Sequence, residues 1–203
     1  LKSLGNIEAA FFQPEAWKPE YPNQAFLNAQ ADDLFWAARR AMAISDEAIR
    51  AAVESAQYSN PAATAYLTDV IIARRDKVGL TWLNVVNPLV DFQLSPSGAF
   101  SSRNIAVDTR RALPAEAYQA RWGRFDNATG AVTEVGEAQS AALPAFQAPA
   151  ELLSSAFVQI EISAMSKVNP GWATPVRVRF RRVPDGWQLV GVIRAADTTG
   201  PDT

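Results

Sequence analysis

The amino-acid sequence predicts an α+β fold, with an N-terminal three-helix layer followed by an antiparallel β-sandwich. The main observation is a change in the spacing of apolar residues at Asn87-Pro88. Before this dipeptide, apolar residues recur every three or four positions, as in amphipathic helices. After it, they alternate in short runs separated by glycine, proline, asparagine and aspartate, as in strands joined by turns.

We expect four segments along the chain. Residues 1–29 form an extended arm rich in aromatic residues and proline, and residues 30–87 form a helical domain. Residues 88–196 form the β-sandwich domain, and residues 197–203 form a disordered tail.

Composition limits the classes of function. The chain has 203 residues, 48% of them hydrophobic and 20% charged, as in ordinary globular proteins. Its net charge of -2 argues against a general nucleic-acid binder, so we expect no nucleic-acid partner. No apolar run approaches the roughly 18 residues of a membrane span. Because the sequence begins with Leu1 and not with methionine, we expect a chain that is processed, truncated or only partly ordered, so that targeting information can be missing with the N-terminus.

The chain contains no histidine and no cysteine. This absence excludes disulfides, cysteine-bound metals and a Ser-His-Asp triad, and it removes the usual general base. Oxygen-bound calcium or magnesium stays open, but the spacing of Asp91, Asp108 and Asp126 fits no calcium loop. A serine–lysine arrangement also stays open, although no lysine is paired with a serine by the sequence. We therefore assign no catalytic residue, metal or cofactor.

The N-terminal arm carries the aromatic residues Trp17, Tyr21 and Phe26 between prolines that favour extended backbone. One interpretation is a docking arm that offers these three side chains to a partner. The other, which we favour, is an arm pinned to its own domain by its aromatic residues, because large aromatic side chains normally seek burial.

Three helices are expected after the arm, over residues 31–43, 45–58 and 60–86. The third has the clearest start, with Asn60 as the cap and Pro61 at the first helical position, and Asn87-Pro88 is expected to end it. The basic cluster at residues 74–77 could bind an anion. Alternatively, it forms a solvated face that pairs with acidic residues of a neighbouring helix.

About seven strands are expected in the second half, and Trp122 should be buried in one of them. The stretch 138–155 should form a long crossover between two sheets. The expected strands cover residues 90–94, 99–107, 118–125, 131–135, 157–162, 176–182 and 187–194.

Arg177, Arg179 and Arg181 alternate along one strand and should project from the same face. They could form a surface for an anion or an acidic partner. Alternatively, they form a solvated outer face that discourages edge-to-edge association. The sequence Asn127-Ala128-Thr129 matches the N-glycosylation pattern, but an expected hairpin loop explains these residues equally well.

Two resemblances add to this interpretation. The strand pattern of residues 89–196 resembles immunoglobulin-like and fibronectin type III modules, although no diagnostic cysteine pair is present. The sequences FQPEAWKPEYPNQAF at residues 12–26 and SDEAIRAAVESAQYSNPAATAYLTDVIIARRDKV at residues 45–78 resemble the C-terminal portion of large, uncharacterised bacterial envelope proteins. In those proteins an upstream segment is similar to an atypical kinase fold. The resemblance implies a periplasmic or extracellular location.

No kinase signature occurs in these residues, so no catalytic residue is carried over from the resemblance. We expect a non-catalytic interaction or scaffold module of the bacterial cell envelope, whose partner is another protein or the upstream part of its own chain. The alternative is the C-terminal fragment of a kinase-like enzyme with its active site upstream. A binder of a small ligand, with a pocket between the helices and the sandwich, also stays open.

Overall fold

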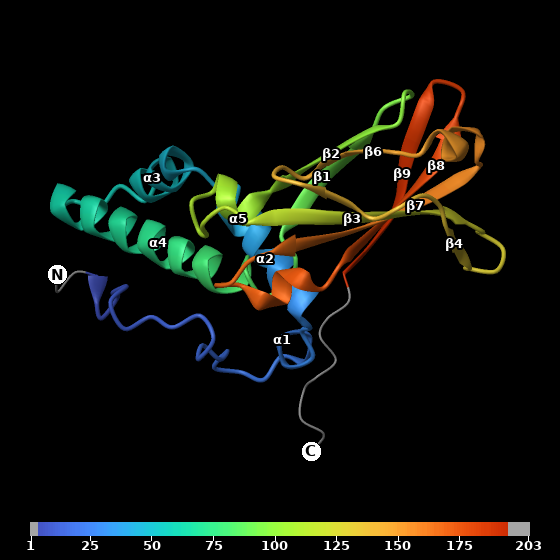
Figure 1. Cartoon of the computed structure of the whole chain (residues 1–203). Helices are drawn as coiled ribbons and strands as arrows, with labels where there is room; N and C mark the ends of the chain where they lie inside the picture. The colour runs from blue at the N-terminus through green and yellow to red at the C-terminus, as the bar shows by residue number, and fades with distance from the viewer. Residues whose placement is uncertain (1–3, 195–203) are drawn as a thin grey trace, which may run out of the picture. The chain divides into compact units, whose positions relative to one another are not determined.

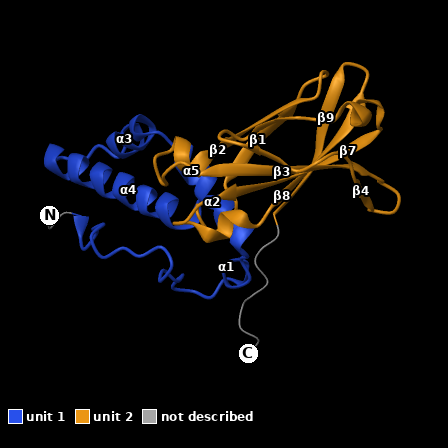
Figure 2. Ribbon diagram, viewed as in Figure 1, with its two compact units in different colours: residues 1–83 blue, residues 84–203 orange. Residues whose placement is uncertain are grey.

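The structure is a computed structural model that describes residues 4–194 (Figure 1). The chain forms two compact units, residues 1–83 and residues 84–203, which Figure 2 distinguishes by colour. The first unit contains helices and the second contains antiparallel sheets, and this confirms the α+β class. The expected disordered tail at residues 197–203 lies outside the described residues.

From residue 4 onward, the first unit contains the three expected helices and one additional short helix before them. Both α2 and α3 pack against the long helix α4. The helices of this unit are α1 (Gln24–Leu27), α2 (Ala31–Met42), α3 (Asp46–Glu54) and α4 (Pro61–Trp82).

Local capping explains where the helices begin. The Ser45 hydroxyl accepts a hydrogen bond from the Ala48 amide at 3.2 Å, and the Asn60 side chain accepts one from the Ala62 amide at 3.0 Å. The expected end of the third helix near residue 86 is wrong. Helix α4 ends at Trp82, where the amide of Leu83 donates to the carbonyl of Gly79.

Gly79 allows close packing of α2 on α4. A Cβ atom at this position would overlap the side chain of Met42, so the missing side chain makes room for the methionine. None of the helices in residues 4–194 is long and apolar enough to cross a membrane.

Basic residues of α4 hold the N-terminal arm. The Arg74 Nε donates to the carbonyl of Glu8 at 2.6 Å, and the Lys77 Nζ donates to the carbonyls of Ala9, Ala10 and Phe12 at 2.6, 2.9 and 3.1 Å. An aromatic side chain of the arm also contacts this helix, because the Arg74 guanidinium lies 5.0 Å from the ring centroid of Phe12. An arm with few regular hydrogen bonds leaves backbone carbonyls free, and long cationic side chains satisfy them.

Up to residue 194, the second unit contains nine strands in two antiparallel sheets. One sheet has the order β1-β2-β6. The other has the order β4-β3-β7-β8-β9, and β5 also pairs with β3. The strands are β1 (Leu89–Leu94), β2 (Ala99–Asn104), β3 (Ala117–Phe125), β4 (Val132–Glu134), β5 (Gln139–Ala141), β6 (Ala145–Gln147), β7 (Phe157–Met165), β8 (Val176–Val183) and β9 (Gly186–Arg194).

Two sequence-based expectations about this unit need correction. The stretch 138–155 does pass from one sheet to the other, but it pairs with both, because β5 joins β3 and β6 joins β2. It also contains a short 3-10 helix, η2 (Ala150–Ser154).

The expected strand over 99–107 stops at Asn104, whose side chain caps the short helix α5 (Ile105–Asp108). A further 3-10 helix, η3 (Pro170–Ala173), precedes β8.

An aromatic cluster forms the core of this unit. Phe100 of β2 contacts Trp122 of β3 and Phe180 of β8 with ring centroids 6.1 and 6.2 Å apart, so it joins the two sheets. It also contacts Phe92 and Phe146 of its own sheet. Trp122 is almost fully buried, as the sequence predicts.

Candidate functional site

The alternation of β8 separates its arginines from the core. Val176, Val178 and Phe180 are buried, and Arg177, Arg179 and Arg181 share the opposite face, as the sequence predicts. On the neighbouring strand β7, Glu161 lies opposite Arg177, Gln159 opposite Arg179 and Phe157 opposite Arg181. These cross-strand pairs determine which arginine has its positive charge compensated by a carboxylate.

Arg177 is neutralised by its neighbour. Its Nε donates to Oε1 of Glu161 at 2.8 Å, and both side chains are partly exposed. This arginine therefore adds little net charge to the face.

Arg179 is held in place without being neutralised. Its Nε donates to Oε1 of Gln159 at 2.8 Å, and its guanidinium lies 3.9 Å from the ring centroid of Phe125. Gln159 is only 2% exposed, and its own amide donates to Glu161 at 3.2 Å. A buried neutral amide and an aromatic ring therefore orient the cation from two sides.

Arg181 also has a neutral partner. Its Nη2 donates at 2.7 Å to Oε1 of Gln188, which lies opposite it on β9. Within residues 4–194, no carboxylate forms an ion pair with Arg179 or Arg181. Two adjacent positions on this face thus carry positive charges that no acidic side chain compensates.

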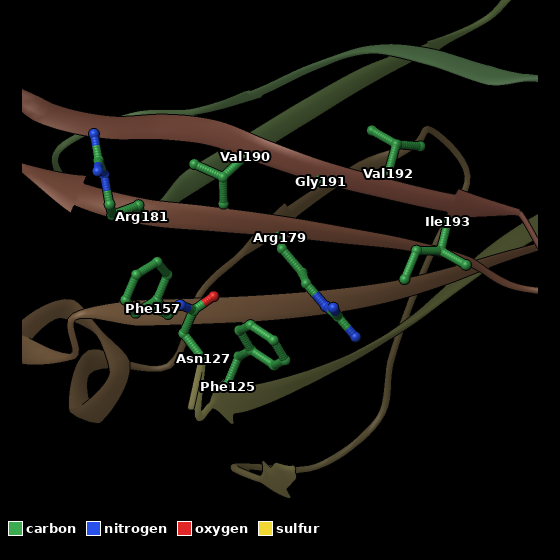
Figure 3. A pocket seen from close by; sticks show the side chains of 9 residues that line it. All are labelled: Phe125, Asn127, Phe157, Arg179, Arg181, Val190, Gly191, Val192 and Ile193. Atoms are coloured by element: carbon green, nitrogen blue, oxygen red, sulfur yellow. The ribbon is translucent and has the colours of Figure 1, made fainter. Parts of the chain in front are cut away.

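These two arginines line an open hollow of about 380 Å³, which Figure 3 shows from close by. We call it the β8–β9 hollow. Its lining contains two positive charges and no acidic residue, and one wall is apolar. The lining residues are Phe125, Asn127, Phe157, Arg179, Arg181, Val190, Gly191, Val192 and Ile193.

The apolar wall comes from the edge strand β9. Val190 and Ile193 are exposed although they are large and aliphatic, and Ile193 lies opposite Arg177 on the arginine face. Gly191 lies opposite Arg179, and its lack of a side chain keeps the hollow open beside the arginine. Phe125 and Phe157, whose ring centroids lie 6.3 Å apart, form the opposite side. The hollow can therefore receive an anionic group with an apolar neighbour.

The three aromatic side chains of the proposed docking arm are exposed, and two of them contact each other. Trp17, Tyr21 and Phe26 are 54%, 80% and 58% exposed. Trp17 and Phe26 form an edge-to-face pair with centroids 5.7 Å apart. Among the described residues, the Tyr21 ring contacts neither of them.

The other candidate sites have internal partners. In the cluster at residues 74–77, Arg75 forms ion pairs at 2.7 Å with Asp46 of α3 and with its neighbour Asp76. This agrees with the expected pairing to a neighbouring helix. Arg103 bridges Asp91 and Asp108 at 3.2 and 2.8 Å.

Asp126, which we considered with Asp91 and Asp108 as a calcium ligand, lies in the β3–β4 turn. Its Oδ1 accepts from the amides of Ala128 and Thr129, and these bonds lower the pKa of the carboxyl group. No group of three or more potential metal ligands occurs in the described part of the chain.

Sequence reasoning missed Gln159, Phe125 and Phe157 as parts of the site. The alternation of β7 already placed Phe157, Gln159 and Glu161 on one face, and this was the available signal. Which of these residues lies beside which arginine depends on the register between β7 and β8, and a single strand does not reveal it.

No protein-family model, curated protein or solved structure matches the chain.

Proposed function

We propose that the chain is a non-catalytic interaction or scaffold module that binds a protein through the β8–β9 hollow. The observation that carries this proposal is the pair Arg179 and Arg181, which neutral side chains orient beside an apolar wall. Charged groups that are fixed before binding lose little side-chain entropy when a partner arrives. Polar groups next to exposed apolar surface are also typical of recognition sites.

We further propose that the second unit is an immunoglobulin-like sandwich. The support is a pair of antiparallel sheets whose aromatic side chains meet through Phe100, Trp122 and Phe180. The partner would be another protein or the upstream part of the same chain. The resemblance to envelope proteins supports a periplasmic or extracellular location.

Capture of a partner by variants of the hollow tests this function. The affinity-tagged chain is incubated with an extract of the source cells, and bound proteins are quantified by mass spectrometry. The test variant is the double charge reversal Arg179→Glu/Arg181→Glu. The matched control reverses two exposed charges of the first unit, Lys18→Glu/Arg50→Glu.

We expect one stoichiometric partner with the natural chain and with the control, and its loss with the test variant. Two results would overturn the proposal: equal retention of every bound protein by the test variant, or turnover of a substrate by the purified chain alone.

A further inference from the structure

The arrangement of charges in the β8–β9 hollow indicates what it binds. Resting on the interaction function proposed above, we infer that the hollow receives an extended acidic segment of a partner protein. In this segment, carboxylates at alternate positions pair with Arg179 and Arg181, and apolar residues between and beside them contact the wall of β9.

The spacing of the two arginines supports an extended occupant. Arg179 and Arg181 are two residues apart on one strand, which places their Cα atoms about 7 Å apart. Side chains at positions i and i+2 of any extended peptide have the same separation. The guanidinium groups lean apart from these Cα positions, because Arg179 reaches toward Gln159 on β7 and Arg181 toward Gln188 on β9; Figure 3 shows the two arginines diverging. Carboxylates at alternate positions of an extended segment share one face and can be offered to both arginines, whereas adjacent carboxylates point to opposite sides.

The partners of the arginines support a carboxylate ligand. Gln159 accepts from Nε of Arg179, and Gln188 accepts from one Nη of Arg181, so each guanidinium is oriented and retains other donors. Carboxylates bind guanidinium groups through paired, charge-assisted hydrogen bonds. Arg177 does not join them, because Glu161 already occupies it.

The surroundings favour a peptide over a nucleic acid. The hollow provides two charges and not the long basic track along which a nucleic-acid backbone binds. Val190 and Ile193 offer aliphatic contacts that suit valine or leucine side chains of a peptide.

Binding of short synthetic peptides tests the inference directly. The probe is a fluorescein-labelled peptide Gly-Val-Glu-Val-Glu-Val-Gly, and its binding to the whole chain is followed by fluorescence anisotropy. One comparison peptide replaces both glutamates by glutamine, and a second places the two glutamates side by side. A labelled oligothymidine of similar length represents the nucleic-acid alternative.

Three variants locate the binding. Arg179→Gln and Arg181→Gln should each weaken binding of the alternating peptide about tenfold, the effect of losing one charge-assisted pair. Arg182→Gln is the matched control, because Arg182 is on the same strand but faces the other way, and it should change affinity less than about twofold. Arg181 is exposed, so its variant decides the question even if Arg179→Gln unfolds.

The expected result is preference for the alternating peptide and weaker binding at high salt, where the Debye length falls to about 3 Å at 1 M. The inference is overturned by equal binding of the glutamine peptide, by preference for adjacent glutamates, by tighter binding of oligothymidine, or by an unchanged affinity in Arg181→Gln. If a cellular partner is still lost from the charge-reversed chain, the interaction function stands and this occupant alone is wrong.

Discussion

Regularly spaced basic residues occur in both units, on α4 of the first and on β8 of the second, and the two sets have different partners. On α4, Arg74 and Lys77 donate to backbone carbonyls of the arm. On β8, Arg179 and Arg181 donate to neutral side-chain amides. The α4 residues therefore satisfy groups of their own unit, and the β8 residues keep charge that faces the β8–β9 hollow.

The difference shows that spacing alone does not make a binding surface. A lysine whose donors are all used by carbonyls has no capacity left for a ligand, whereas an arginine with five donors can be oriented by one bond and still bind through others. The identity of the partner, and not the basic residue itself, separates a structural role from a recognition role.

The units also differ in what holds them together, and the largest predicted effect concerns the sheet unit. Phe100→Ala removes the ring that touches four other aromatic rings across both sheets. The lost burial and the resulting cavity should lower the free energy of unfolding by about 3–5 kcal/mol. Urea denaturation, followed by tryptophan fluorescence, measures this change.

The control for this variant is Phe11→Ala, because Phe11 is 87% exposed and belongs to the other unit. It should change stability by less than about 0.5 kcal/mol. A loss below 1 kcal/mol in Phe100→Ala would mean that the aromatic cluster does not join the sheets as described.

The corresponding change in the helical unit is Lys77→Ala. The Nζ of Lys77 donates to three carbonyls of the arm, so the variant should release residues 9–12 and cost about 2 kcal/mol, since hydrogen bonds to charged groups are among the stronger ones. Hydrogen exchange measured by mass spectrometry should show faster exchange in the arm and little change in β8. Lys18→Ala, at an exposed lysine of the arm itself, should leave exchange unchanged.

Features that depend on neighbouring residues in the sequence were predictable. Ser45 and Asn60 mark helix starts because their side chains cap the first turn, and this is a local interaction. The common face of Arg177, Arg179 and Arg181 follows from the two-residue period of a strand. In contrast, β5 and β6 have three residues each, too few for alternation to show.

Features that depend on distant residues were not predictable. The sequence gives no sign that Lys77 binds the carbonyl of Ala9, because the two are far apart along the chain and a carbonyl occurs in every residue. Likewise, the β8–β9 hollow depends on register. A shift of the β7–β8 register that placed Glu161 beside Arg179 would neutralise that arginine and leave Arg177 charged.

The smallest predicted loss of stability concerns a buried hydrogen bond of the sheet unit, and it is the counterpart of the Lys77 contacts in the helical unit. Tyr118→Phe removes the hydroxyl that accepts a hydrogen bond from Nδ2 of Asn104 at 3.1 Å. Both residues are buried, so the amide loses its partner and the free energy of unfolding should fall by about 1 kcal/mol at neutral pH. Urea denaturation measures the loss, and Tyr58→Phe, at an exposed tyrosine of the other unit, is the control.

The pH dependence of this difference distinguishes a buried hydroxyl from an exposed one. Burial raises the pKa of Tyr118 above the ordinary tyrosine value of about 10, so the hydroxyl stays protonated up to a higher pH in the folded state than in the unfolded state. Its contribution to stability is therefore fully present below pH 10 and is lost as the pH rises through the raised pKa of the folded state. Tyr118→Phe lacks this group, so the stability gap between the natural chain and the variant should narrow above about pH 10. If the difference in unfolding free energy between the two proteins stays constant at alkaline pH, Tyr118 is accessible to solvent in the folded state. The hydrogen bond between Asn104 and Tyr118 is then not shielded from water as described.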